Sequence, residues 1–247
     1  SGKIGDLYKL DGGIGRDSQL RFGLGIGAPA SSSQPGFYLN VASNELNLDE
    51  WQRFLQANKV HGTQDSRSSS STINAQITAQ IKKLTLFDRP WQDVNLSANN
   101  KKNIWDLRIS SPQAAGQIQY QDAQKSNTNG LISGRLSKLK IADLPTPSES
   151  SAKQATPPKK ALRPEAIPNL DIVIDDFSLV KAQLGQLKIK SNTVDNVLKI
   201  DSIQTNNPQG SSAISGQWTG ATKNTPDHSA LNIEMSIKDA GQIIAHW

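Results

Sequence analysis

The feature that most constrains this chain is a strict alternation of apolar and polar residues, which recurs in separate runs. Residues 73–81 read Ile, Asn, Ala, Gln, Ile, Thr, Ala, Gln, Ile, and residues 105–109 read Trp, Asp, Leu, Arg, Ile. Residues 231–237 follow the same rule with Leu, Ile, Met and Ile. A period of two is typical of a β-strand that has one apolar and one polar face. The chain is therefore predicted to consist of strands with one face to cover.

Shorter alternating runs occur around 20–26, 38–41, 94–98, 172–179 and 184–189. Turn-forming pairs such as Asn129-Gly130 and Asn207-Pro208 separate the runs, which favours antiparallel hairpins. The alternation changes phase at Lys82-Lys83, which suggests a β-bulge. We expect an all-β fold, a long, curved antiparallel sheet that forms an open groove, with only one or two short helices.

One segment, 48–58, is predicted to be helical. Asn47 can cap its first turn, with Glu50 three residues further on. The apolar side chains of Trp51, Phe54 and Leu55 recur at spacings of three and four, as on one face of a helix. A second short helix is expected to begin near Asp239.

Residues 144–168 differ from the rest of the chain. They are rich in Pro, Ser, Ala and Lys and show no apolar periodicity, so we expect an exposed, flexible loop. The loop divides the chain into a segment 1–143, which includes the short helix, and a segment 169–247. The second segment is expected to continue the sheet of the first.

Composition excludes several classes of protein. Hydrophobic residues make up 35% of the chain and the mean hydropathy is -0.51, and no apolar run approaches the roughly 18 residues that cross a bilayer. The net charge is +5, but basic residues are scattered and no basic stripe with interleaved aromatics occurs, which argues against nucleic acid as a partner. Cysteine is absent, which is compatible with an oxidising compartment and does not exclude the cytosol.

No catalytic constellation is recognisable in the sequence. The histidines His61, His228 and His246 stand in no metal-binding spacing, and neither a nucleophile elbow nor a thiol occurs. The glycines at 23, 25 and 27 lie in an alternating run, where they favour a strand over a phosphate-binding loop. We therefore expect no catalytic residue, no metal and no cofactor, and a protein that is not an enzyme.

The apolar strand faces must be covered by another sheet, a helix or a ligand. A protein core is the commoner occupant, and the one predicted helix is too small to cover this many strands. If the occupant is a ligand, the side chains that line its groove are Ile73, Ala75, Ile77, Ala79, Ile81, Trp105, Leu107, Ile109, Leu231, Ile233, Met235 and Ile237.

Short motifs follow one another in a recognisable order. They are Leu46-Asn-Leu48-Asp49-Glu-Trp51, Leu84-Thr-Leu86-Phe87, Val94-Asn-Leu96-Ser-Ala98, Trp105-Asp-Leu107, Gly116-Gln-Ile118 and Gly134-Arg-Leu136 before the Pro-rich loop, and Gly216-Gln-Trp218 and Asp239-Ala-Gly241 after it. Over residues 40–247 this order resembles the AsmA-like superfamily, and within it the YhdP-type proteins of Gram-negative envelopes.

The resemblance implies a function that periodicity alone does not. YhdP-type proteins are similar to bridge-like lipid carriers built from a repeating β-groove, anchored in the inner membrane and crossing the periplasm. The chain would then be an internal portion of such a carrier, shielding phospholipid acyl chains between the inner and outer membranes. The alternative is a structural or assembly factor of the envelope, with a closed β-sandwich and no ligand.

Overall fold

The computed structural model describes residues 2–4, 8–14, 20–30, 35–50, 74–123, 129–142, 163–222 and 225–238. Contacts divide the chain into two compact units, Ser1–Gln117 (unit 1) and Ile118–Trp247 (unit 2). The predicted groove residue Ile73, the helical residues 51–58, the helix expected near Asp239 and most of the loop 144–168 lie outside the described residues.

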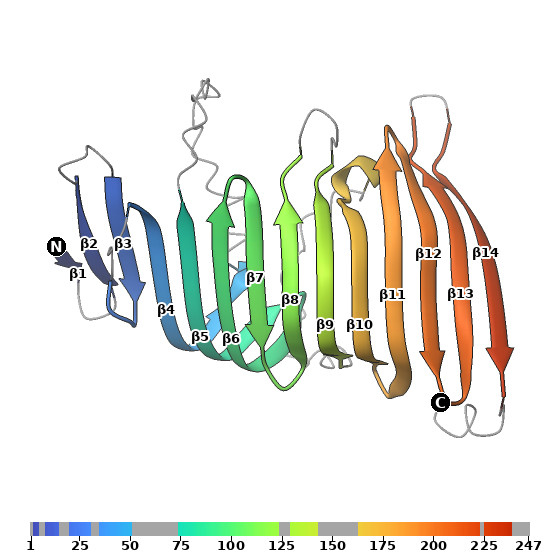
Figure 1. Ribbon diagram of the computed structural model, residues 1–247, viewed down its shortest axis with the longest axis horizontal. Helices are drawn as coiled ribbons and strands as arrows, with labels where there is room; N and C mark the ends of the chain where they lie inside the picture. The colour runs from blue at the N-terminus through green and yellow to red at the C-terminus, as the bar shows by residue number, and fades with distance from the viewer. Residues whose placement is uncertain are drawn as a thin grey trace, which may run out of the picture. The chain divides into compact units, whose positions relative to one another are not determined.

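Unit 1 is a sheet in which strands are neighbours in chain order (Figure 1). Its strands are β1 (Gly2–Ile4), β2 (Tyr8–Ile14), β3 (Leu20–Ile26), β4 (Gly36–Asn47), β5 (Ala75–Leu86), β6 (Arg89–Lys101) and β7 (Ile104–Ser110). The next strand, β8 (Ala114–Gln121), contains the division between the units. The longest strands of this unit, β4 to β6, include the alternating runs at 38–41 and 94–98 and residues 75–81 of the third run.

Unit 2 has the same construction. Its strands, again side by side in chain order, are β9 (Leu131–Ile141), β10 (Asn169–Leu179), β11 (Ala182–Val194), β12 (Val197–Asn207), β13 (Gly210–Thr219) and β14 (His228–Ile237). A short 3-10 helix, η2 (Pro164–Ala166), precedes β10. The predicted fold class is confirmed, because the described residues are nearly all in open, curved sheet with almost no helix.

Three neighbouring pairs differ from the expected antiparallel arrangement. β3 with β4, β4 with β5 and β9 with β10 run parallel. Parallel neighbours cannot be joined by a tight hairpin, because the chain must return to the end of the sheet where the first strand began. The long connections 48–74 and 142–168 provide that return for β4–β5 and β9–β10.

The strands β4, β5 and β6 curve strongly in the lower part of Figure 1. The phase change predicted at Lys82-Lys83 lies within β5. The β-bulge expected there is wrong: the register passes from Ile81↔Val94 to Lys83↔Gln92 without a shift, so neither strand has an extra residue. Asp93, which lies opposite Lys82, has a left-handed φ of 46°, so both strands change phase at the same level.

Two local predictions can be checked in the described part of the chain. Residues 48–50 are helical, and the Asn47 side chain accepts a hydrogen bond from the backbone N–H of Glu50 at 3.1 Å, which confirms the predicted cap. Gly23 and Gly25 lie within strand β3, as expected, whereas Gly27 follows the last residue of the strand and has a positive φ of 62°. A Cβ on Gly25 would collide with the backbone of Ala28 and Ala30, so the glycine allows the chain after β3 to pass close to the strand.

Candidate functional site

Apolar side chains of unit 1 lie in straight rows that cross the strands. Directly paired residues of neighbouring strands share one face of a sheet. One row is Leu10, Leu24, Leu39, Ile77, Ala98 and Leu107, and the next is Tyr8, Ile26, Val41, Ala79, Leu96 and Ile109. These rows, with Phe37, Ala75, Ile81, Val94 and Trp105, form the apolar face of unit 1. They run from β2 to β7.

The register brings together the residues predicted from two separate runs. Ile77 of β5 and Leu107 of β7 are both paired with Ala98 of β6, so they share a face. Ala79 and Ile109 meet in the same way through Leu96. All the described groove candidates of unit 1 therefore lie on one face: Ala75, Ile77, Ala79, Ile81, Trp105, Leu107 and Ile109.

The bend of β4 to β6 buries part of this face. Ala79, Ile81, Leu84 and Val94 form a cluster in which each side chain is less than a tenth exposed. Leu46, Leu86 and Trp91, from beyond the bend, pack against that cluster together with Val41, Leu96 and Ile109. Because residues from both arms of the bend meet at one cluster, the apolar face lies on its inner side.

The opposite face of unit 1 is polar and exposed to solvent. Gln76, Gln80 and Lys82 of β5 are exposed, and Lys83 forms a 2.8 Å ion pair with Glu45 of β4. An exposed pair of this kind contributes little to stability and keeps the surface hydrated. The two faces of unit 1 thus differ sharply in polarity.

An unbroken ladder of isoleucines crosses unit 2. The pairs Ile172↔Ile189, Ile189↔Ile203, Ile203↔Ile214 and Ile214↔Ile233 are all direct register partners. We call these five residues the isoleucine ladder. It spans β10 to β14, and at about 4.8 Å between strands its length is on the order of 20 Å.

One further row borders the ladder on each side. The first consists of Leu170, Ser191, Ile200, Gly216 and Leu231, and the second consists of Leu136, Ile174, Leu187, Thr205, Ser212 and Met235. The ladder and these rows form the apolar face of unit 2. The predicted groove residues Leu231, Ile233 and Met235 lie on it.

Burial on this face decreases towards β14. Ile174 and Leu187 are 3% and 6% exposed, whereas Ile233 and Met235 are 57% and 69% exposed. Ile237, the last predicted groove residue, is opposite Gly210 and is 49% exposed. On β14 the apolar side chains are open to any ligand that reaches the face.

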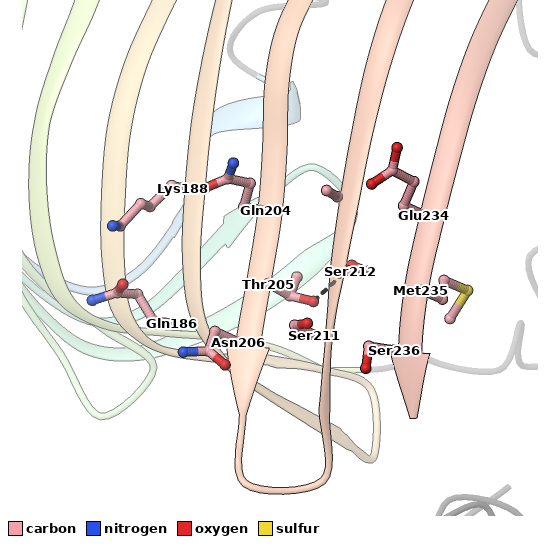
Figure 2. Close-up of a pocket in the computed structure, with 11 residues that line it drawn as sticks. Gln186, Lys188, Gln204, Thr205, Asn206, Ser211, Ser212, Glu234, Met235 and Ser236 are labelled. Carbon is pink, nitrogen blue, oxygen red and sulfur yellow. Dashed lines mark hydrogen bonds between the residues drawn. The ribbon is translucent and has the colours of Figure 1, made fainter. Parts of the chain in front are cut away.

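Hydroxyl groups interrupt the bordering rows of unit 2. Thr205 and Ser212, on β12 and β13, form a hydrogen bond of 2.7 Å between their side chains (Figure 2). Ser191 is 7% exposed, and its hydroxyl has no hydrogen-bond partner among the described residues. Sequence reasoning missed these three side chains, because serine and threonine are unremarkable in alternating strands.

The segment around η2 closes one end of the apolar face of unit 2. Pro164 is fully buried and lies beside Gly220, at the end of β13. The Thr193 hydroxyl donates to the Ile167 carbonyl at 3.3 Å, and the Thr193 backbone N–H donates to the Asn169 side chain at 2.7 Å. These contacts fix η2 against the ends of β11 and β12.

The polar face of unit 2 contains a shallow hollow formed by β11 to β14 (Figure 2). Gln186, Lys188, Gln204 and Glu234 contribute to its lining, and Figure 2 shows Glu234 and Met235 on opposite sides of β14. Three of these four side chains are exposed and Gln186 is half-buried, which is typical of a hydrated strand surface.

On the same face, Arg135 of β9 makes a bidentate ion pair with Asp175 of β10, with N···O distances of 2.7 and 3.0 Å. The hydrogen bonds from Arg135 hold the pKa of Asp175 below its ordinary value, and the charge of Arg135 acts in the same direction. The pair joins the parallel strands on either side of the connection 142–168.

Within each unit, the described strands make substantial contact only with their lateral neighbours and, for β11 and β12, with η2. Among the described residues, no second sheet packs on either apolar face. In a closed sandwich, a second sheet would cover each face. The rows of both apolar faces contain no charged side chain. No group of three or more acidic, His or Cys residues that could hold a metal occurs in the part that the structure describes.

No helix among the described residues has the length and apolar character needed to cross a bilayer. Comparisons with curated proteins and with solved structures gave no significant match. The family model described as YhdP protein matches residues 1–247, which is the whole chain. The chain therefore belongs to the YhdP protein family.

Proposed function

We propose that this chain is a segment of a carrier that shields phospholipid acyl chains between the inner and outer membranes of a Gram-negative bacterium. The observation that carries the proposal is the pair of apolar faces, on neither of which a second sheet packs among the described residues. The rows of these faces cross the strands and contain no charged side chain. Membership of the YhdP family, a family of the bacterial envelope, supports a periplasmic site of action.

The energetics require such a surface. Two acyl chains contain roughly 30 methylenes, and at about 0.8 kcal/mol each their exposure to water costs on the order of 25 kcal/mol. A continuous apolar surface keeps the chains out of water at every step of their passage. The headgroup can remain in solvent, so the carrier needs no catalytic residue, cofactor or metal.

Native mass spectrometry of the purified chain tests the proposal. We expect phospholipid to be co-purified with the wild type. Ile77→Asp and Ile233→Asp each place a charge on an apolar face and should reduce the bound lipid, while circular dichroism shows that the strands remain. The matched controls, Thr78→Asp and Asn232→Asp, place the same charge on the opposite face one residue away and should retain lipid.

Two results would contradict this function. One is a wild type that carries no lipid even after incubation with phospholipid vesicles. The other is unfolding of both Ile→Asp variants, because a charge unfolds the protein only where other protein side chains already cover the face. Together these results would favour a structural factor of the envelope with a covered apolar core.

A further inference from the structure

The two ends of the strands in unit 2 differ in charge, and this difference carries an inference that rests on the proposed function and extends it. Lys140 stands near the end of β9, Lys181 lies in the turn between β10 and β11, and Lys238 directly follows β14. The backbone N–H of Lys238 donates to the Gln209 carbonyl at 2.9 Å, which places this lysine beside the turn between β12 and β13. We call this end of the strands, with its three lysines, the basic rim.

The charge of the basic rim is not neutralised within the described residues. All three lysines are exposed, and none of them forms an ion pair there. The nearest acidic residues along these strands, Asp176 on β10 and Glu234 on β14, lie three residues inside the strand ends. Asp176 is also the register partner of a further lysine, Lys138. The basic rim is therefore a row of cations available to an anion from outside the protein.

The opposite end of the strands has acidic side chains and is occupied by protein. Glu165, Asp195 and Asp227 lie there, and Arg163 is 3.8 Å from Glu165. At the same end, η2 contacts β11 and β12, and its Pro164 is fully buried. An anionic group is therefore disfavoured at the η2 end, both by charge and by the protein that already lies there.

Apolar side chains of β10 extend from the isoleucine ladder to the basic rim. Phe177 is 8% exposed, and Leu179, two residues further on, is 41% exposed. The next residue, Val180, is 46% exposed in the turn. β10 has 11 residues and spans roughly 35 Å. The chains of one lipid occupy about half of a 30 Å hydrocarbon core, so they fit between the basic rim and η2.

We infer that a lipid bound on the apolar face of unit 2 has one direction, with the phosphate of an anionic headgroup at the basic rim and the acyl chains directed along the strands towards η2. Lysine ammonium groups attract a phosphodiester anion as point charges. The same groups repel the ammonium of a zwitterionic headgroup. The basic rim therefore favours lipids whose headgroup has a net negative charge.

A competition between two headgroups tests the preference. The delipidated chain is incubated with vesicles that contain equal amounts of palmitoyl-oleoyl phosphatidylglycerol and palmitoyl-oleoyl phosphatidylethanolamine, and the bound lipids are compared by native mass spectrometry. We expect phosphatidylglycerol to be favoured by roughly threefold to tenfold at low salt. The preference should shrink at about 1 M salt, where screening limits electrostatic attraction to about 3 Å.

Lysine variants assign the preference to the basic rim. Lys140→Gln, Lys181→Gln and Lys238→Gln together should bring the ratio of bound lipids close to one while total lipid binding persists. The matched control removes the same three charges from other positions of β11 and β12. Its substitutions are Lys188→Gln, Lys190→Gln and Lys199→Gln, and it should keep the wild-type ratio.

The direction of the lipid is tested with a nitroxide label at either end of β11. The chain has no cysteine, so Val180→Cys and Val194→Cys each provide a single labelling site. Both valines are exposed, and the 13 residues of β11, which span roughly 40 Å, separate them. A label at position 180 should broaden the phosphorus NMR resonance of bound phosphatidylglycerol, whereas a label at position 194 should leave it narrow.

The outcomes separate the two proposals. Equal binding of both headgroups by the wild type overturns the role of the basic rim and leaves the carrier function intact. Loss of the preference in the control variant also overturns that role, because net charge would then be its cause. A resonance broadened equally by both labels, or only by the label at position 194, overturns the direction. Binding of neither lipid overturns the carrier function and the orientation together.

Discussion

At the scale of single residues, side chains on the two apolar faces divide into those that are buried and support the fold and those that are exposed. Val94 is 2% exposed within the cluster of unit 1, whereas Met235 is 69% exposed on β14. Val94→Ala should lower the free energy of unfolding by about 2 kcal/mol, because it leaves a cavity among packed side chains. Met235→Ala should change it by less than about 0.5 kcal/mol.

Urea denaturation measures both changes in the free energy of unfolding. The midpoints of the variants can be compared with that of the wild type when the dependence of this free energy on urea concentration is the same. The contrast depends on the absence of protein over β14 in the described structure. If Met235→Ala were as destabilising as Val94→Ala, the exposed end of the face would be covered in solution, and its availability to lipid would be in doubt.

The ion pair between Arg135 and Asp175 gives a pH-dependent prediction. A carboxylate whose pKa is lower in the folded state contributes stability above its unfolded pKa, which is about 4, and loses it as the pH falls through the folded value. Asp175→Asn should therefore lower the melting temperature at neutral pH, and the difference from wild type should shrink on acidification below about pH 4. Both groups are accessible to solvent, so we expect a small effect that salt weakens.

Thermal melts across this pH range, at low and high salt, provide the measurement. Glu45→Gln, which removes the exposed ion pair between Glu45 and Lys83 in unit 1, serves as a comparison. If the melting temperatures of Asp175→Asn and the wild type differed by the same amount at all pH values, the charge of the carboxylate would not be the cause of the difference.

At the scale of elements, the turn of the hairpin between β5 and β6 is hydrogen-bonded to a residue outside the hairpin, Asp49. Its turn residues Phe87 and Asp88 both have positive φ, at 56° and 57°, and their backbone N–H groups donate to the Asp49 carboxylate at 2.9 and 2.8 Å. Side chains with a Cβ are strained in this left-handed region. Asn-Gly is the favoured sequence for such a turn.

Replacing Phe87-Asp88 by Asn-Gly should therefore raise the free energy of unfolding by about 1 kcal/mol, measured by urea denaturation. Phe87 is 72% exposed, so little packing is lost, and both N–H donors to Asp49 remain. Asn103→Gly, in the turn between β6 and β7, should give a smaller gain because Asn already tolerates a positive φ. A loss of stability on the Asn-Gly change would show that the Phe87 side chain has a contact in solution.

The strands could be predicted from alternation, but their pairing could not. Ile77 and Leu107 each belong to a predicted apolar run, yet only the register through Ala98 shows that they share one row. The isoleucine ladder was missed for the same reason, because each strand contributes a single member to it. Alternation is local, whereas register depends on turns and on crossovers such as 48–74, whose course the residues do not reveal.

The same limit applies to the hydroxyls of the candidate site. Ser191 and Thr205 each occupy an apolar-phase position of a strand, which is the one signal the sequence offers. That the two residues lie in the rows on either side of the isoleucine ladder is a property of the assembled sheet. The lack of a nucleophile-elbow motif and of a contiguous zinc-binding motif, in contrast, is a property of the sequence itself.

At the scale of the whole molecule, the loop 144–168 predicts how the chain responds to cleavage. Its composition predicts that trypsin cuts first at Lys153, Lys159 or Lys160. Arg163 is exposed, but it precedes Pro164, and trypsin does not cleave before proline. After cleavage, β9 belongs to one fragment and β10 to the other. In the intact chain these strands are paired along their full lengths, from Leu131↔Asn169 to Ile141↔Leu179.

We therefore expect the fragments to stay together under native conditions and to elute as one species by size-exclusion chromatography, separating only in denaturant. The reason is that Leu136 and Ile174, which are register partners across the cut, are 5% and 3% exposed, so parting the strands would expose apolar surface. Combining the cleavage with Leu136→Asp should release the fragments, because a charge would enter that buried row. Lys140→Asp, at an exposed position of β9 opposite Ser178, is the control and should leave them associated. Fragments that part without denaturant would show that the β9–β10 pairing depends on the covalent loop, and that the two sides of the cut are not held as one sheet.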